Sequence, residues 1–167
     1  MCAYKFESFD FEYNAAYASF LLKRDMGGVM DCIFCKLVAG KIPSTRIYED
    51  EETLAFLDIA PIINGHTLVI PKTHFDPLTA APPAILAACM ATVQRVAQAQ
   101  LDALGADGVN VHLANGTAAG QVVPHLHFHV IPRFANDGHH WNWHGHAYGS
   151  MAEMQALGDT LKTAINR

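Results

Sequence analysis

The chain has 167 residues, 51% of them hydrophobic and 16% charged; this composition excludes disordered and fibrous proteins, and the length favours one domain. Eleven Lys and Arg against sixteen Asp and Glu give a formal net charge of -5, with no dense basic block. We therefore expect no nucleic acid polymer and no membrane as partner, so any phosphate must be bound by a few locally placed groups.

Residues 1–29 show no clear hydrophobic period, whereas Cys32-Ile33-Phe34-Cys35 looks like the start of a domain. We expect an N-terminal extension over residues 1–29, a domain over residues 30–134, and a His- and Trp-rich loop with a helix over residues 135–167. The extension is either a helical arm or the product of an upstream start codon. Four irregularly spaced cysteines, acidic residues near the N-terminus and the lack of an apolar stretch of about 18 residues predict a cytoplasmic protein.

We expect short helices and strands over residues 32–71. Residues 32–40 predict an apolar turn or helix that ends at a glycine. Residues 46–49 and 53–57 predict two strands joined by an acidic turn, and together they read as a hairpin. After a loop, residues 66–71 form an apolar, β-branched run of strand length, so a third strand follows.

The longest element is a helix over residues 82–105, where apolar residues recur at three- and four-residue spacing. Two prolines open it and Gly105 closes it, in agreement with helix-end preferences. Two more strands, over residues 109–113 and 122–131, flank a glycine-containing loop, and a last helix covers residues 151–165. Strands joined by short turns around one long helix predict an α+β fold with a mostly antiparallel sheet.

The strand over residues 122–131 contains the run His125-Leu126-His127-Phe128-His129. Because alternate side chains of a strand share a face, the three histidines line one side and the apolar residues enter the core. Imidazole titrates near neutral pH, so one ring can act as nucleophile while a neighbour supplies a proton to the leaving group. Two other interpretations remain open: a polar strand face exposed to water, and three ligands of one catalytic metal ion.

This run, extended by Val130 and Ile131, resembles the His-φ-His-φ-His-φ-φ signature of the histidine-triad (HIT) superfamily, in which φ is apolar. Other segments resemble bacterial members of that family, in the same order along the chain. They are Asp31-Cys32-Ile33-Phe34-Cys35-Lys36, Leu54-Ala55-Phe56-Leu57-Asp58-Ile59, Gly65-His66-Thr67-Leu68-Val69-Ile70-Pro71-Lys72-Thr73-His74 and Ala119-Gly120-Gln121. The resemblance covers roughly residues 31–134.

The resemblance implies a HIT-like α+β fold with a five-stranded antiparallel sheet, one long helix and one or two short helices. It also implies a homodimer that joins two such sheets into one of ten strands, and no catalytic cofactor. The implied activity is hydrolysis or transfer at the α-phosphate of purine nucleotides, either nucleoside phosphoramidates or dinucleoside polyphosphates, through a nucleotidyl-histidine intermediate on His127. The alternative is a nucleotide-binding signalling module with negligible turnover.

Position by position, the resemblance makes His127 the nucleophile and His129 a contact of the phosphate or leaving group. His66 corresponds to the remaining active-site histidine of the family. Two positions depart from the pattern, because Ala114 stands where many members have Asn or Gln, and Val122 replaces a Ser or Thr. These departures leave the nucleophile intact and concern the preferred leaving group.

A nucleotide site is implied as well. Its expected residues are Phe56, Asp58, Ile59, Asn115, Gly120 and Gln121. Asp58 would hold ribose hydroxyls, although core packing also explains the two apolar residues and a turn cap also explains Asp58. The loop over residues 115–121 can turn backbone N–H groups toward an anion, with Gln121 polarising a phosphate oxygen, although an ordinary turn explains it too.

The Cys32-x-x-Cys35 pair lacks the second cysteine pair of a zinc ribbon and the βαβ context of a redox pair, yet such pairs in cytosolic proteins usually signal metal or redox chemistry. Family members with this motif resemble each other in a structural zinc site, and its ligands here would be Cys32, Cys35, His74 and His125. A closed set of this kind would hold the N-terminal turn to the last strand and take no part in turnover. The alternative is two buried free thiols.

Overall fold

The computed structural model describes residues 32–140 and 145–166. One compact unit ends at Ala135, and Asn136–Arg167 form a second unit. The expected extension over residues 1–29 lies outside the described residues, as do residues 141–144 of the His- and Trp-rich tract. Among the described helices, none is long and apolar enough to cross a membrane.

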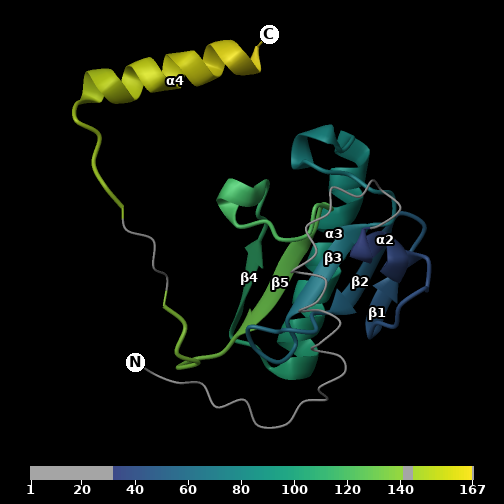
Figure 1. The fold of residues 1–167 in the computed structure, drawn as a ribbon. Helices are drawn as coiled ribbons and strands as arrows, with labels where there is room; N and C mark the ends of the chain where they lie inside the picture. The colour runs from purple at the N-terminus through teal and green to yellow at the C-terminus, as the bar shows by residue number, and fades with distance from the viewer. Residues whose placement is uncertain (1–31, 141–144, 167) are drawn as a thin grey trace. The chain divides into compact units, whose positions relative to one another are not determined.

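The first unit is a five-stranded sheet with helices on both sides (Figure 1). Its elements are α2 (Ile33–Val38), β1 (Arg46–Glu49), β2 (Thr53–Leu57), β3 (Thr67–Pro71), the 3-10 turn η2 (Leu78–Ala80), α3 (Pro83–Leu104), β4 (Gly108–His112), the 3-10 turn η3 (Thr117–Ala119) and β5 (Phe128–Arg133). The second unit contains α4 (Met151–Ile165). The strand order is β1-β2-β3-β5-β4, and every neighbouring pair is antiparallel, so the predicted α+β fold with a five-stranded antiparallel sheet is confirmed.

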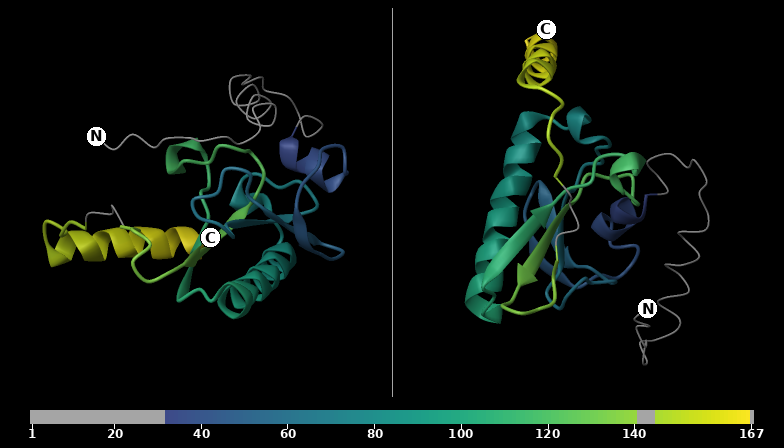
Figure 2. Two further views of the ribbon diagram at one scale, coloured as in Figure 1. Left: turned by 90° about the horizontal axis from the view of Figure 1, so that it is seen from below. Right: turned by 90° about the vertical axis from the view of Figure 1, so that its left-hand side faces the viewer.

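Both faces of the sheet are covered, with α3 along one face and α2 against the other (Figure 2). The core beneath α3 comprises Ala55, Val69, Ala81, Cys89, Val93, Val96, Leu126, Phe128 and Val130. The core beneath α2 comprises Cys32, Phe34, Leu37, Leu54, Phe56, Leu68, Ile70 and Val123. Because strand side chains alternate between faces, β2 and β3 are buried on both sides, and each core takes every second residue.

The long helix has the ends that its sequence predicts. Pro83 occupies the first turn, where its missing N–H is no loss, and Gly105 caps the C-terminus with φ of 66°. The last turn of α3 lies close to the loop before β3. A Cβ added to Gly65, whose φ is +92°, would stand 2.6 Å from Leu104 Cδ1, so only glycine fits this turn without displacement.

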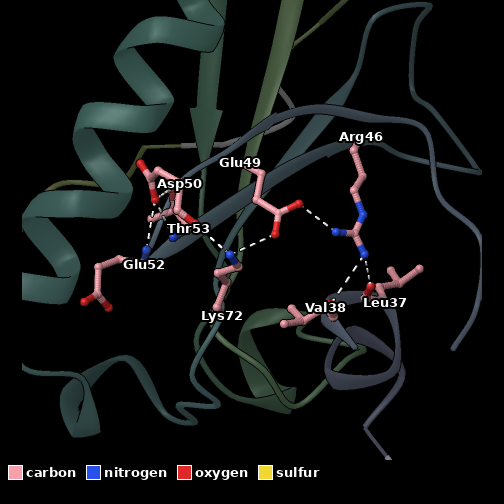
Figure 3. Close-up of polar contacts among 8 residues, drawn as sticks. All are labelled: Leu37, Val38, Arg46, Glu49, Asp50, Glu52, Thr53 and Lys72. Atoms are coloured by element: carbon pink, nitrogen blue, oxygen red, sulfur yellow. Dashed lines mark hydrogen bonds and ion pairs between the residues drawn. The ribbon is translucent and has the colours of Figure 1, made fainter. Parts of the chain in front are cut away.

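The hairpin of β1 and β2 also holds α2 in place, as Figure 3 shows. Arg46 Nη2 donates to the carbonyl oxygen of Leu37 at 2.5 Å, at the open C-terminal end of α2. On the same side Lys72 Nζ lies 2.8 Å from Glu49 Oε1 and donates to the carbonyl oxygen of Asp50 at 2.7 Å. The Arg46 bond fixes the C-terminal end of the helix that carries Cys35, and the Lys72 contacts brace the hairpin.

The prediction for the last strand is wrong at both ends. Pairing with β3 begins at Phe128, whereas the N–H groups of His125 and Leu126 donate to the carbonyl oxygens of Val123 and Phe75 at 2.9 and 2.7 Å. The segment before Phe128 is therefore held by a loop and not by a strand ladder. The strand also passes through Pro132, which pairs with β4 after the β3 ladder has ended, where a missing N–H is tolerated.

Candidate functional site

His127 is buried with one ring nitrogen left for chemistry. Its side chain is 6% exposed, and its ring centroid lies 5.3 Å from that of Phe34 and 5.0 Å from that of His129. Its Nδ1 lies 2.6 Å from the carbonyl oxygen of His125. Because a carbonyl oxygen can only accept, Nδ1 carries the proton and Nε2 keeps its lone pair. Burial lowers the pKa of His127 below its usual value, so the ring is neutral at pH 7.

His129 and His66 form a second histidine pair. His66 Nε2 and His129 Nδ1 are 2.9 Å apart, and the N–H of Ile62 donates to His66 Nδ1 at 3.2 Å. Since His66 Nδ1 accepts, the neutral ring carries its proton on Nε2 and donates it to His129 Nδ1. The proton of neutral His129 must then lie on Nε2. Burial lowers the pKa of both rings, that of His129 to about 3.

Asp58 lies on the side of the His66 ring opposite to His129. Its Oδ2 lies 3.5 Å from His66 Nδ1, and its charge raises the pKa of His66 against the stronger effect of burial. The two nitrogens of His66 therefore face opposite partners, Asp58 and His129. The three side chains each offer one ligand atom within 4.8 Å of the others, but the His66 nitrogen nearest His129 is engaged in the bond between the two rings. The contacts therefore form a chain from Asp58 through His66 to His129 that suits proton transfer.

The three residues expected around the base and ribose differ in their surroundings. Phe56 is 4% exposed and packs edge-on against Phe34 at 5.6 Å, so its position is that of a core residue. Ile59 is 51% exposed and open to a ligand. Asp58 Oδ1 accepts from the N–H of Ala60 at 2.9 Å, which is the turn cap, while its other oxygen faces His66.

The loop over residues 115–121 is closed upon itself. Gln121 Oε1 accepts from the N–H of Gly116 at 2.6 Å, and Gln121 Nε2 donates to Asp76 Oδ1 and to the carbonyl oxygen of Val123, both at 3.0 Å. The N–H of Gly120 donates to the carbonyl oxygen of Thr117. Gln121 thus braces the loop, and polarising a phosphate would require it to give up one of these bonds.

Asn115 lies at the start of this loop. Its Oδ1 accepts from the N–H of Leu78 at 2.6 Å, which links the loop to η2. Ala114, where many HIT sequences carry an amide side chain, is 8% exposed. The next residue, Asn115, carries an amide group on an exposed side chain.

Two cysteines and two histidines converge at the N-terminus of α2. His125 Nδ1 lies 3.5 Å from Cys32 Sγ, 3.7 Å from Cys35 Sγ and 3.2 Å from His74 Nδ1. His74 Nδ1 lies 3.4 Å from Cys35 Sγ. A tetrahedral zinc ion, with Zn–S of about 2.3 Å and Zn–N of about 2.0–2.1 Å, separates nitrogen from sulfur ligands by about 3.5 Å and two nitrogens by about 3.3 Å. The four side chains fit that geometry.

The chemistry of these groups agrees with their spacing. His125 Nε2 lies 2.9 Å from the carbonyl oxygen of Pro71, so the proton of the ring is on Nε2 and the lone pair of Nδ1 points at the other three groups. Burial, reinforced by Cys32, raises the pKa of the Cys35 thiol to about 11. A bound cation would offset that cost, because thiolates are stabilised by the metal they ligate.

The three histidines of the triad do not converge on one point. The Nδ1 atoms of His125, His127 and His129 face the cysteine cluster, a backbone carbonyl and His66, respectively. Both nitrogens of His125 are engaged. This geometry gives no support to the interpretation of one catalytic metal held by all three rings.

Sequence reasoning missed two neighbours of the triad. Phe34 packs edge-on against both His125 and His127, and His112 lies directly opposite His129 in the β4–β5 register, with ring centroids 5.8 Å apart. The sequence held a weak signal for His112, namely a histidine in the strand predicted just before the glycine loop. The sequence does not reveal which residue of the last strand lies opposite His112.

A neutral buried histidine with an unprotonated Nε2, next to a histidine pair and a carboxylate, is chemically able to act as a nucleophile. Residues 39–136 match the family model of the HIT domain, and the chain belongs to that family.

The chain is similar to two named enzymes. It is 43% identical over 107 residues to an adenylylsulfatase from Arabidopsis thaliana, and the match spans 64% of this chain and 54% of that protein, about half of its length. It is 39% identical over 137 residues to an adenosine 5'-monophosphoramidase from Schizosaccharomyces pombe, across 81% of this chain and 99% of that protein.

Among solved structures, the chain resembles a Zn-bound histidine triad family protein from Mycobacterium smegmatis. The TM-score is 0.65 and the identity 43%, over 82% of this chain and 99% of that chain. The sheet with its flanking helices is thus a HIT fold.

Proposed function

We propose that this protein hydrolyses or transfers nucleotidyl groups at the α-phosphate of purine nucleotides, with His127 as the nucleophile. The observation that carries the proposal is the bond from His127 Nδ1 to the carbonyl oxygen of His125, which leaves Nε2 unprotonated and free to attack. The two named relatives, an adenylylsulfatase and an adenosine 5'-monophosphoramidase, support the substrate class.

In the first step His127 Nε2 forms a bond to the α-phosphorus, and the bond from phosphorus to the leaving group breaks. Positive charge develops on the ring of His127, and its Nδ1–H bond to the carbonyl oxygen of His125 stabilises that charge. The product is a nucleotidyl-histidine. Water then attacks the phosphorus, the mononucleotide leaves, and the nitrogen lone pair of His127 is restored.

The leaving group takes the proton from His129 Nε2. His66 passes its Nε2 proton to His129 Nδ1 in turn, because the two atoms already share a hydrogen bond. An anionic substrate favours the uptake of one extra proton on His66 Nδ1, which then gives up the N–H of Ile62 as its partner and faces Asp58. His66 therefore stays neutral after it passes its Nε2 proton to His129. In the second step the attacking water returns one proton to the relay, so the site ends as it began.

We also propose that Cys32, Cys35, His74 and His125 hold a structural zinc ion, which the similar Zn-bound structure supports. When bound, the ion supplies a fixed tetrahedral link between α2 and the segment before β5. His125 leads directly to the carbonyl oxygen on which the tautomer of His127 depends. The metal site therefore supports the nucleophile by position and takes no part in the reaction.

The proposal further includes a homodimer and a cytoplasmic location, which are typical of the family that the sequence resembles. An alternative is a module that binds nucleotides and turns them over negligibly. The free Nε2 of a buried, neutral His127 favours an enzyme, since binding alone needs no such nitrogen.

The test is to incubate the purified protein with adenosine phosphoramidate and with diadenosine tetraphosphate and to measure AMP. We expect AMP from the wild type, an adenylyl adduct in the mass of acid-quenched protein, and the loss of both in His127→Ala. His140→Ala, which changes a histidine that takes part in none of the site contacts described above, serves as the matched control and should retain activity. A thermal shift with nucleotide but no AMP would show that the protein binds nucleotides without turning them over. Near-normal turnover by His127→Ala would contradict His127 as the nucleophile.

A further inference from the structure

The buried side chain of Gln100 links the two histidines of the relay through their backbones. Gln100 lies on α3 and is 4% exposed, and its Nε2 donates to the carbonyl oxygens of Gly65 and Val130, both at 3.0 Å. Gly65 immediately precedes His66, and Val130 immediately follows His129. One amide group therefore holds the chain on both sides of the hydrogen bond between the two rings.

Backbone bonds hold His66 toward β2 and its own loop, since its carbonyl oxygen accepts from the N–H of Asp58 at 2.9 Å and its N–H donates to that of Ile63 at 3.0 Å. The pairing of β3 with β5 does not extend to His66. The ladder between β3 and β5 runs from Val69 and Phe128 to Thr67 and Val130, where it ends. His66 immediately precedes Thr67 and is the last loop residue before β3. The bonds of Gln100 continue the connection between the two segments past the last ladder pair.

The orientation of the amide is unambiguous, because two carbonyl oxygens need two N–H donors and only the NH2 group has them. This leaves Gln100 Oε1 buried with no hydrogen-bond partner among the described residues. An unpaired buried oxygen destabilises a fold, and an apolar side chain of similar size would avoid it. Glutamine at this position thus combines two bonds to backbone carbonyl oxygens with one unpaired buried oxygen.

The loop that contains Gly65 also packs closely against α3, the helix that carries Gln100. A Cβ on Gly65 would meet Leu104 Cδ1 at 2.6 Å and Pro132 Cγ at 3.2 Å. The backbone next to His66 thus has α3 on one side and β5 on the other, with the amide of Gln100 bonded to both segments.

We propose that Gln100 is a positioning residue for the proton relay, which sets the separation of His66 and His129 by tying Gly65 to Val130. The kinetic part of this inference rests on the proposed function. Its structural part does not, because the bond between the two rings exists without substrate.

The test compares Gln100→Met with the wild type in the full chain, purified with its bound metal. Methionine has a similar length and no N–H donor, so it fills the space and removes the tie. Long-range 1H–15N spectra of the imidazole rings, recorded without substrate, report the protonated Nε2 of His66 and the accepting Nδ1 of His129. We expect both signals to move toward those of unbonded neutral rings. We also expect kcat to fall on the order of ten- to a hundredfold with KM nearly unchanged, as misplaced catalytic groups produce.

Two controls separate position from stability. Gln98→Met makes the same change on the same helix, where Gln98 Nε2 donates to the exposed Asp102 at 2.9 Å, and it should leave the ring signals and kcat unchanged. Thr67→Val removes the other side-chain donor to the Gly65 carbonyl, from Thr67 Oγ1 at 2.9 Å, without touching Val130. It should keep the wild-type ring signals.

Unchanged ring signals and kcat in Gln100→Met would overturn the proposal, and so would an equal change in Thr67→Val. If Gln100→Met does not fold, Gln100→Ala replaces it, and failure of both to fold would assign Gln100 to stability alone. A wild type that forms no AMP would contradict the proposed function, while the spectra would still decide whether Gln100 holds the pair.

Discussion

His129 shows how burial tunes a single residue. Burial, together with the charges that His127 and His66 would carry, lowers its pKa from 6.5 to about 3. An unfolded chain keeps the ordinary value, so below pH 6.5 the unfolded state binds a proton that the folded state does not. This residue therefore costs the fold no stability above pH 6.5, and it destabilises the fold increasingly as the pH falls toward its folded pKa.

The expected result is a free energy of unfolding that declines on acidification more steeply in the wild type than in His129→Asn, which cannot titrate. The difference can reach about 1.4 kcal/mol per pH unit for one proton. Urea unfolding between about pH 7 and about pH 5 measures it, and the zinc ligands are the same in both proteins. Parallel declines of the two proteins would show that His129 is not the group responsible.

Asp58 has two roles, capping a turn and facing His66 with its charge, and two substitutions can distinguish them. Asp58→Asn retains an oxygen for the N–H of Ala60 but loses the charge that faces His66, whereas Asp58→Ala loses both. We expect Asp58→Asn to unfold at nearly the wild-type temperature and to lose about tenfold or more in kcat, a modest part of what proton transfer contributes. AMP formation and thermal unfolding measure the two effects. Full activity in Asp58→Asn together with instability in Asp58→Ala would reduce Asp58 to a turn cap.

At the scale of elements, local patterns predicted what depends on neighbours along the chain. The ends of α3 follow from its prolines and Gly105, and β1 and β2 agree with the expected ranges. The start of β5 was missed because alternation of apolar and polar residues continues through an extended loop, and only the partner strand decides where a ladder begins. The two-fold period still placed the triad and the core residues on opposite sides.

The site was predictable in its residue types and not in its contacts. His127 and His129 come from one short run, whereas the tautomer of His127 depends on a carbonyl that no pattern reveals. Gln121 was expected to face the phosphate, and its bonds to the loop could not be read from the sequence. Likewise Gln100 looked like any polar residue of a helix, because its partners lie far along the chain.

Helix α2 is too short to be stable alone, since isolated helices need about 12–15 residues. It is held at its C-terminal end by Arg46, and its N-terminal end meets the cysteine and histidine cluster. Cys35→Ser should therefore lose bound zinc and unfold several degrees lower than the wild type, because the N-terminal anchor is gone. Metal content by atomic absorption and thermal unfolding measure this.

The matched control for this variant is Cys89→Ala, which changes a buried cysteine in the other core, away from the cluster. It should keep one zinc ion per chain even where the core loses some stability. Equal zinc content in Cys35→Ser and the wild type would contradict the proposed ligand set.

For the whole molecule, the two edges of the sheet differ in their protection against pairing. The edge strand β1 has an irregular register between Arg46 and Tyr48, and charged residues at both ends. The other edge strand, β4, pairs regularly with β5 throughout and contains no Lys, Arg, Asp or Glu. Bulges and charges are the devices that keep edge strands from joining, and β4 has neither.

We therefore expect the proposed dimer to form through β4 and to be disrupted by a charge on it. Val111 and Ile47 lie on the two edge strands and are both 47% exposed, so Val111→Lys and Ile47→Lys make the same change at equally exposed positions. Sedimentation velocity should give the wild type and Ile47→Lys twice the 18.2 kDa mass of one chain, and Val111→Lys the mass of a single chain. A monomeric wild type would exclude the dimer, and dissociation by Ile47→Lys alone would move the interface to the opposite edge.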